Sequence, residues 1–303
     1  MRKMLPFALL TAAATITFAQ TTPSTSTPAS APATNPYTKF AATAPAVPNP
    51  RDNQPFTNDT VNNLKPDLPT LFIAGDSTAA TGNRTTRGWA ALLVDYFDTS
   101  KVNLCNRAVG GQRFNTYTPT WNQILGAVKP GDFVVIQMGH NSGPLAGIGP
   151  ETQPAARGGG GGEPVHTHGW YVQKYISDVR AKKATPIVMT LTLRDLWKDA
   201  KVERLKKLSN GDVEGMSDWS RQVAEKEKCL LIDHSNIIGD MYDKLGPEKV
   251  HPMFGDGYLH TNTAGAVINC EAFIAGLKAL PDMPLVADLN DKGKAVPAYE
   301  PKK

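Results

Sequence analysis

Cysteine is scarce in this sequence, with three residues among 303. Cys105, Cys229 and Cys270 each lie in or beside an apolar run, and none belongs to a CxxC pair or to a Cys/His spacing typical of zinc sites. We therefore interpret them as small buried hydrophobic side chains, which leaves room for one disulfide. The cysteines give no reason to expect a metal ion.

An excess of charge of one sign is also absent. Lys and Arg number 32 and Asp and Glu 28, which gives a net charge of +4, and no dense block of Lys or Arg occurs. A nucleic-acid partner is therefore not expected. Beyond the first twenty residues, no stretch approaches the roughly eighteen apolar residues of a membrane span, so we expect a soluble mature protein.

The chain opens with MRKMLPFALLTAAATITFAQ, which combines two positive charges, an apolar stretch and small residues near a cleavage point. This pattern is typical of a secretory signal peptide, and the alternative is an uncleaved anchor. The Thr-, Ser-, Pro- and Ala-rich segment that follows cannot bury enough apolar surface to fold. We predict a signal peptide over 1–19, a flexible linker over 20–67, a folded domain over 68–282 and a loose polar tail over 283–303.

Inside the predicted domain, short apolar runs alternate with helical patterns. Five runs are typical of strands buried on both faces: 70–75, 102–108, 132–139, 185–191 and 229–234. Helical patterns occupy 88–97, 170–183, 217–228 and 261–280. Repeated strand–helix–strand units predict a parallel sheet covered by helices on both faces. In such sheets, functional sites form at the carboxyl ends of the strands.

Ser77, in LFIAGDSTAA, directly follows the first predicted strand. Taken alone, this position is typical of a helix cap. A serine nucleophile needs a base and a group that orients the base. His260 lies in a loop-like stretch before a capped helix and is the candidate base, although a packing role would suit it equally well. Asp256 lies four residues earlier and is the candidate for orienting the imidazole.

Ester hydrolysis by serine also needs N–H donors for the oxyanion. The pair Gly110-Gly111 permits close approach of the backbone to a ligand, unless the pair only forms a tight turn. Asn141, after the third predicted strand, offers a side-chain amide, although such a residue often bonds its own loop. The backbone N–H of Ser77 is the third candidate donor.

Four polar or glycine-rich segments follow one another along the chain: GDSTAA, NRAVGGQRFNTY, MGHNSG and DGYLHTNTAGA. Together they resemble the four sequence blocks of the SGNH (GDSL-type) hydrolases, and HGWYVQKYISDVRAKKATPIVMTLTLRDLW is similar to the rhamnogalacturonan acetylesterase-like branch. The resemblance covers about residues 68–282. It implies a flavodoxin-like three-layer α/β/α sandwich with a parallel five-stranded sheet. It also implies hydrolysis of acetyl esters on plant polysaccharide.

The resemblance assigns a role to each block. It implies that Ser77 attacks the acetyl carbonyl, that His260 takes its proton and that Asp256 orients His260. The backbone N–H groups of Ser77 and Gly111 and the side chain of Asn141 would hold the oxyanion. On this reading no cofactor is needed.

Two departures from the family pattern stand out. The family usually spaces its acid three residues before the histidine, and Gly257 occupies that position here. We expect this glycine to let the loop bulge so that the carboxylate of Asp256 still reaches the imidazole. Ser142 stands where the family commonly has Asp after the Asn, which affects a contact within the loop and leaves the amide donor in place.

Three further features carry alternatives. The stretch RGGGGGEP (157–164) lacks the lysine of a phosphate-binding loop and is interpreted as a flexible surface loop. HTHGW (166–170) places two histidines two apart, but no cluster of carboxylates or thiols completes a metal site. Arg194 and Trp197 follow the fourth predicted strand, where they would contact sugar hydroxyls or a uronate, or else form a salt bridge and pack.

The sequence thus predicts a secreted serine esterase, periplasmic or extracellular, that acts as a monomer on an acetylated polysaccharide or oligosaccharide. A lipase or general esterase of the same family is one alternative. A catalytically silent carbohydrate-binding protein is another.

Overall fold

The computed structural model describes residues 64–83, 85–142, 147–148, 152–153, 165–204 and 215–301. The predicted signal peptide, the predicted linker up to residue 63 and the glycine-rich stretch at 157–164 lie outside these residues. All candidate site residues lie within them.

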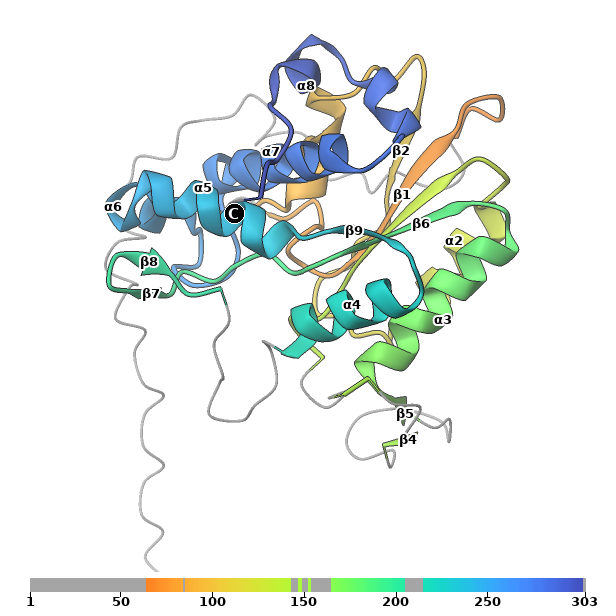
Figure 1. The fold of residues 1–303 in the computed structure, drawn as a ribbon, viewed down its shortest axis with the longest axis horizontal. Helices are drawn as coiled ribbons and strands as arrows, with labels where there is room; N and C mark the ends of the chain where they lie inside the picture. Colours follow the sequence, from red (N-terminus) through yellow and green to blue (C-terminus); the bar gives the residue numbers. More distant parts are fainter. Residues whose placement is uncertain are drawn as a thin grey trace, which may run out of the picture. The chain divides into compact units, whose positions relative to one another are not determined.

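A five-stranded parallel sheet forms the middle layer of the described domain (Figure 1). Its strands are β1 (Thr70–Gly75), β2 (Asn103–Asn106), β3 (Phe133–Gln137), β6 (Thr185–Met189) and β9 (Leu230–Ile232). Their spatial order is β2-β1-β3-β6-β9, and every neighbouring pair runs parallel. The five predicted strands are confirmed. The strand order reverses between β1 and β3, and the carboxyl edge at such a reversal is where ligands bind in open α/β sheets.

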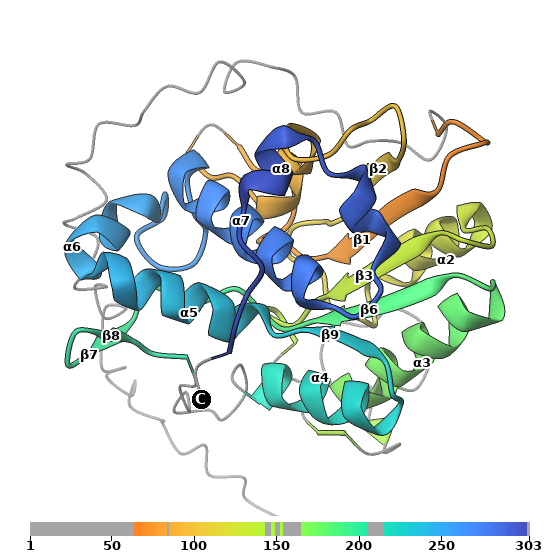
Figure 2. The same cartoon turned by 45° about the horizontal axis from the view of Figure 1, so that its top comes forward.

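Helices cover both faces of this sheet (Figures 1 and 2). One face carries α2 (Thr118–Ala127), α3 (His168–Ala181) and α4 (Gly215–Lys226). The other carries α5 (His234–Leu245), α7 (Thr263–Ala279) and the 3-10 helix η2 (Trp89–Asp95). Side chains of β1 alternate between the two cores, with Leu71 and Ile73 in one and Phe72 and Ala74 in the other. The predicted flavodoxin-like three-layer sandwich is therefore confirmed.

Three of the four predicted helices begin and end within two residues of the predicted positions. The helix α7 starts as its sequence indicates, because the side chain of Asn262 accepts hydrogen bonds from the N–H groups of Ala264 and Gly265. The fourth, predicted over 88–97, forms the tighter 3-10 helix η2 in the structure. It still buries Trp89, as the helical pattern predicts.

Several short elements complete the described domain. They are α6 (Pro247–Val250), the 3-10 helix η4 (His251–Met253) and two short antiparallel pairs, β4 (Thr152–Gln153) with β5 (Val165–His166) and β7 (Trp197–Lys198) with β8 (Lys201–Val202). Among the described residues, every helix is too short or too polar to serve as a membrane span.

The expectation of a loose tail after residue 283 is wrong for the residues up to 301. Pro284–Asp288 forms the 3-10 helix η5 and Asp291–Ala295 forms α8. Leu285 and Leu289 are fully buried in the same core as α7, and Leu289 forms an antiparallel bridge with Phe97. The anchoring side chains are few and lie among charged residues, so no amphipathic period is visible in the sequence.

No disulfide forms within the described part of the chain, which includes all three cysteines. Cys105 and Cys270 are buried, and Cys229 is half-buried. Burial raises the pKa of the Cys229 thiol to about 11. The interpretation of these residues as small buried side chains therefore agrees with the structure, and the disulfide that the sequence leaves open does not form.

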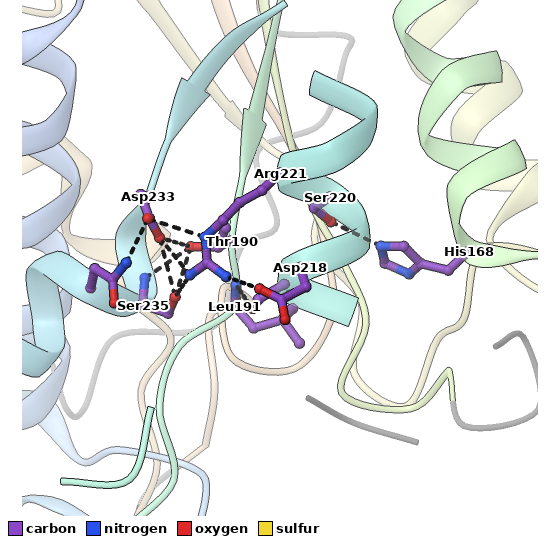
Figure 3. Close-up of polar contacts among 10 residues, drawn as sticks. His168, Thr190, Leu191, Asp218, Ser220, Arg221, Asp233 and Ser235 are labelled. Atoms are coloured by element: carbon purple, nitrogen blue, oxygen red, sulfur yellow. Dashed lines mark hydrogen bonds and ion pairs between the residues drawn. The ribbon is translucent and has the colours of Figure 1, made fainter. Parts of the chain in front are cut away.

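A polar network ties α4 to the ends of β6 and β9 (Figure 3). The guanidinium of Arg221, on α4, donates to both carboxylate oxygens of Asp233 at 2.8 and 3.1 Å and to Asp218 at 2.6 Å. Thr190, just beyond β6, donates to Asp233 at 3.2 Å. On the other side of α4, Nε2 of His168 lies 2.9 Å from Oγ of Ser220. These contacts fix α4 beside the carboxyl edge of the sheet.

Three buried histidines predict that the protein loses stability in mild acid. Burial lowers the pKa of His168 to about 3 and the pKa values of His140 and His234 to about 4. In an unfolded chain, histidine has a pKa of about 6.5. The native state therefore binds fewer protons than the unfolded chain between about pH 6.5 and pH 4, so the free energy of unfolding falls as the pH falls through this window.

We expect urea titrations to give a lower free energy of unfolding at pH 5 than at pH 7, by roughly 2 kcal/mol for each of these histidines. His168→Gln removes one titrating group and should make the pH dependence shallower. Equal wild-type stability at the two pH values, or an unchanged slope in the variant, would contradict this prediction.

Candidate active site

Ser77 lies in a tight turn at the carboxyl end of β1. The turn is closed by the N–H groups of Ala79 and Ala80, which donate to the carbonyl of Asp76 at 3.2 and 3.1 Å. No helix starts at this turn, and the next helix in the described chain is η2, so the helix-cap interpretation of Ser77 is wrong. The turn presents a partly exposed hydroxyl at the edge where the strand order reverses.

The structure brings His260 to this hydroxyl across 183 positions of sequence: its Nε2 lies 2.8 Å from Oγ of Ser77. On the other side of the ring, Nδ1 lies 2.6 Å from Oδ2 of Asp256. A carboxylate there accepts a hydrogen bond from Nδ1–H, which keeps that proton on Nδ1 and leaves Nε2 to accept the proton of the Ser77 hydroxyl. The side chains of His260 and Asp256 remain about one third exposed, at 32% and 36%, so a substrate can reach them.

The four-residue spacing of the acid is accommodated at Gly257, which adopts a φ of +71°. This turn lets the other oxygen of Asp256, Oδ1, accept from the backbone N–H groups of Tyr258, Leu259 and His260 at 2.8 to 3.0 Å. The loop thus wraps around its own carboxylate. The expected bulge is present, and the carboxylate reaches the imidazole.

These contacts set the protonation state of Asp256. Partial burial alone would raise its pKa, but the hydrogen bond from His260 and those from the backbone N–H groups outweigh it and lower the pKa to about 2. Asp256 is therefore a carboxylate throughout the neutral and mildly acidic range. It can stabilise a positive charge that develops on the imidazole.

The candidate oxyanion donors come from the next two loops. Gly111, after β2, has a φ of +75°, and a Cβ built on its neighbour Gly110 would stand 3.7 Å from Cβ of Ser77. Asn141, after β3, donates through Nδ2 to the carbonyl of Gln112 at 3.2 Å, which joins the two loops. An amide NH₂ has two N–H groups, so this bond fixes the amide plane and leaves the second N–H for a ligand.

Asp76 holds the nucleophile turn and the Asn141 loop together. Its carboxylate is fully buried and accepts four hydrogen bonds, two from Thr78 at 2.9 and 3.1 Å and two from the backbone N–H groups of Gly139 and His140 at 3.2 and 3.1 Å. These four hydrogen bonds occupy the carboxylate of Asp76, which therefore braces the turn that carries Ser77.

His140 is a buried histidine of this site that the sequence reasoning did not single out. Its Nε2 lies 2.9 Å from Oγ1 of Thr192, in the loop after β6. Burial is the largest reason for its low pKa, opposed by Asp76 and reinforced by Arg194 and His260. It stays neutral at pH 7 and links the Asn141 loop to the next loop along the edge. Its place directly before Asn141, inside the segment MGHNSG, is the signal that could have found it.

Arg194 and Trp197 differ in what they contact. The guanidinium of Arg194 lies over the ring of Tyr258, 4.9 Å from its centroid, two residues before His260. Trp197 donates through Nε1 to Asp195 at 2.8 Å, and its ring packs against the core and against His251. The contacts of Trp197 support the packing interpretation, whereas Arg194 lies beside the loop that carries His260.

A second serine–histidine contact, between Ser220 and His168, shows what distinguishes the first. Its length is similar, at 2.9 Å, but His168 is fully buried and Ser220 is 5% exposed. Its Nδ1 has no hydrogen-bond partner among the described residues, so no carboxylate orients the ring. Only the pair at Ser77 combines access for a substrate with an oriented base.

No group of three or more His, Cys, Asp or Glu side chains in the described ranges is arranged to hold a metal ion. The two histidines of HTHGW have separate partners. His166 stacks on Trp170, with ring centroids 3.6 Å apart, while His168 contacts Ser220.

An α/β/α sandwich with an oriented histidine at a serine on its carboxyl edge has the architecture of a serine hydrolase. Residues 73–268, more than half of the chain, match the GDSL-like Lipase/Acylhydrolase family. The chain belongs to this family, and the family resemblance seen in the sequence is confirmed.

Relatives of known name are distant in sequence. The chain is 26% identical over 217 residues to the rhamnogalacturonan acetylesterase of Emericella nidulans, across 68% of this chain and 83% of that protein. It is 27% identical over 219 residues to the probable rhamnogalacturonan acetylesterase YesY of Bacillus subtilis, across 69% of this chain and 93% of that one. The crystal structure of B. subtilis YxiM aligns with a TM-score of 0.54 at 26% identity, across 70% of this chain and 56% of that chain.

Proposed function

We propose that the protein is a secreted serine esterase that removes acetyl groups from a pectic polysaccharide of the rhamnogalacturonan type. The observation that carries the proposal is the continuous contact from Asp256 through His260 to Ser77 at 2.6 and 2.8 Å. The acetyl and pectic parts rest on the names of the two relatives.

The proposed reaction has two steps. In the first, Oγ of Ser77 attacks the acetyl carbonyl while its proton passes to Nε2 of His260. The bond between the tetrahedral carbon and the sugar oxygen then breaks, that oxygen takes the proton from His260 and departs as a hydroxyl group, and acetyl-Ser77 remains. In the second step, His260 takes a proton from water as the water attacks the acetyl group. Oγ of Ser77 then leaves and takes the proton back from His260, and the product departs as acetic acid, which ionises to acetate in water.

The oxyanion of each tetrahedral intermediate would be held by the N–H groups of Ser77 and Gly111 and by the free N–H of Asn141. Asp256 stabilises the imidazolium of His260 through the bond at Nδ1. Since all groups belong to the chain itself, the proposed reaction has no step that calls for a cofactor.

Asn141→Ala should lower kcat by about 10²-fold to 10³-fold with little change in KM, because the amide is proposed to act on the charge that develops in the transition state. The measurement is steady-state hydrolysis of p-nitrophenyl acetate. Asn290→Ala, which removes the amide that caps α8, is the matched control and should keep kcat. A kcat for Asn141→Ala equal to that of the control would remove Asn141 from the proposed site.

The choice of a carbohydrate over a lipid substrate is supported by the surface. Among the described residues, the large apolar side chains that are clearly exposed are Val94 and Ile148. A lipase is expected to present a large apolar rim around its site. The half-buried guanidinium of Arg194 and phenol of Tyr258, which lie together beside His260, suit sugar hydroxyl groups better.

The substrate is tested by acetate release from acetylated rhamnogalacturonan, acetylated xylan and a long-chain ester, with His260→Ala beside the wild type. We expect release from rhamnogalacturonan by the wild type alone. Release only from xylan would overturn the pectic assignment, and faster hydrolysis of the long-chain ester would favour a lipase. Binding of polysaccharide with no turnover of any ester would favour a carbohydrate-binding protein.

Secretion is proposed from the signal-like segment 1–19 and is tested separately. The exported protein should begin at Gln20 when its amino terminus is determined by mass spectrometry. A chain that retains residues 1–19 and stays with the membrane fraction would instead indicate the uncleaved anchor.

A further inference from the structure

A buried carboxylate beside the candidate active site has no part in the reaction proposed above. Asp195 lies in the loop after β6 and is 1% exposed. Its Oδ1 accepts from Nδ1 of His251 at 2.7 Å and from Nε1 of Trp197 at 2.8 Å. His251 opens the short helix η4, only five residues before Asp256. The carboxylate therefore binds the segment that leads into the loop of the acid and the histidine.

The backbone of Asp195 holds the same loop at a second point. Its N–H donates to the carbonyl of Tyr258 at 2.8 Å, between Asp256 and His260. The neighbouring Arg194 covers the ring of Tyr258. One residue thus contacts both the entry of the loop, at His251, and its tip, at Tyr258.

The loop between these points is closed on itself. Phe254 and Thr261 form an antiparallel bridge, and the N–H of Gly255 donates to the carbonyl of His260 at 2.8 Å. Together with the three backbone bonds to Asp256, this closure makes the loop a compact unit. Its internal bonds fix Asp256 relative to His260, but they do not fix His260 relative to Ser77.

The position of His260 relative to Ser77 must therefore be set by contacts between this loop and the rest of the domain. On one side, the N–H of Arg87 donates to the carbonyl of Thr261, and the hydroxyl of Thr261 donates to the carbonyl of Arg87 at 3.1 Å. On the other side, Asp195 contacts His251 and Tyr258. The 2.8 Å contact between His260 and Ser77 tolerates little displacement, since a misplacement of about 1 Å can cost about 10²-fold in rate.

The energetics of Asp195 point away from a purely stabilising role. Its Oδ2 is buried and accepts no hydrogen bond from any described residue. Burial, opposed by the bonds from Trp197 and His251 and reinforced by the nearby Asp256, raises its pKa. A buried carboxylate with one unsatisfied oxygen costs stability that an apolar side chain of similar size would not.

We propose that Asp195 is a positioning residue which, through His251 and Tyr258, holds the loop of Asp256 and His260 in register with Ser77. This inference rests on the proposed esterase function for its effect on rate, but not for its effect on the loop. Asp195 does not touch the reacting atoms, so it acts only through His260.

The first test is a double-mutant cycle on p-nitrophenyl acetate hydrolysis by the full chain. Asp195→Ala should lower kcat about 10-fold to 100-fold with KM within about twofold, because positioning affects the reacting geometry. In the His260→Ala background, the same substitution should leave the residual rate unchanged. Equal losses in the two backgrounds, or a kcat within about twofold of the wild type, would overturn the proposal.

The second test does not depend on esterase activity. Hydrogen exchange followed by mass spectrometry should show faster exchange in the peptide that contains residues 254–261 of Asp195→Ala. Unchanged exchange there would overturn the proposal, whatever the activity of the wild type. If the wild type itself did not hydrolyse the ester, the proposed function would be rejected instead.

Asp132→Ala is the matched control. Asp132 is also a fully buried carboxylate, but it lies at the amino end of β3 and accepts from the N–H of Thr70 at 2.8 Å. The Asp132→Ala variant should be less stable than the wild type but should keep its kcat and its exchange rate in residues 254–261. If Asp195→Ala does not fold, His251→Ala breaks the same contact from the other side and carries the same expectations.

Discussion

Ser77→Ala should lower kcat for ester hydrolysis by about 10⁴-fold to 10⁶-fold, because alanine offers no atom on which an acyl intermediate can form. His260→Ala should cost a similar factor, since its Nε2 is the group that lies 2.8 Å from the hydroxyl. The double variant should lose no more than either single variant, because the two side chains act as one unit. Steady-state hydrolysis of p-nitrophenyl acetate measures all three.

The chain supplies a close control for this experiment. Ser220→Ala removes the hydroxyl of the other serine–histidine pair, which is buried and has no orienting carboxylate. It should keep kcat near the wild-type value. If Ser77→Ala kept kcat within about tenfold of the wild type, or if Ser220→Ala abolished hydrolysis, the assignment of the nucleophile would be wrong.

Asp256→Asn should produce the second large effect, a fall in kcat of about 10³-fold to 10⁴-fold. The amide is nearly the same size, but it carries no charge to stabilise the imidazolium and no longer fixes which ring nitrogen of His260 holds the proton. KM should change little, because the loss concerns the transition state. The measurement is kcat and KM for p-nitrophenyl acetate at neutral pH.

The pH profile gives an independent check on Asp256. Since hydrogen bonds from His260 and the backbone lower its pKa to about 2, its own titration should not affect wild-type kcat above about pH 4. Asp132→Asn, at the opposite edge of the sheet, should leave kcat unchanged. A full-activity Asp256→Asn variant would mean that the imidazole is oriented by another group.

The strands could be predicted from the sequence because each is a short apolar run with no helical period. In a parallel sheet both faces are buried, so such runs are what the fold requires. The helix α5 was not predicted, since it follows β9 after Asp233 alone and no loop segment marks where it begins. The packing of Leu285 and Leu289 was missed because so few apolar residues anchor that segment.

The geometry of Asp256 could be predicted only in part from the local sequence. Gly257 indicates that a bulge is permitted, and the structure shows a positive φ there and a carboxylate in contact with the imidazole. Whether three backbone N–H groups would also meet that carboxylate depends on the whole turn, which no single residue specifies.

Contacts between distant segments could be predicted only where the family resemblance linked them, as it did for Ser77 and His260. Asp195 and His251 are 56 residues apart, and nothing in the sequence of either segment indicates that the two side chains are partners. Trp197 was a candidate for sugar binding because aromatic residues at the carboxyl edge commonly contact ligands. Its bond to Asp195 and its packing against the core depend on how β7 and β8 fold back.

The account stands on the claim that the hydroxyl of Ser77 takes up the acyl group, and trapping that intermediate tests it most directly. The full chain is mixed with an acetyl ester, quenched in acid within milliseconds, digested and analysed by mass spectrometry. We expect the mass of one acetyl group on the peptide that contains Ser77, and none in Ser77→Ala. An acetyl group on another side chain, or rapid turnover with no acetylated peptide, would contradict the account.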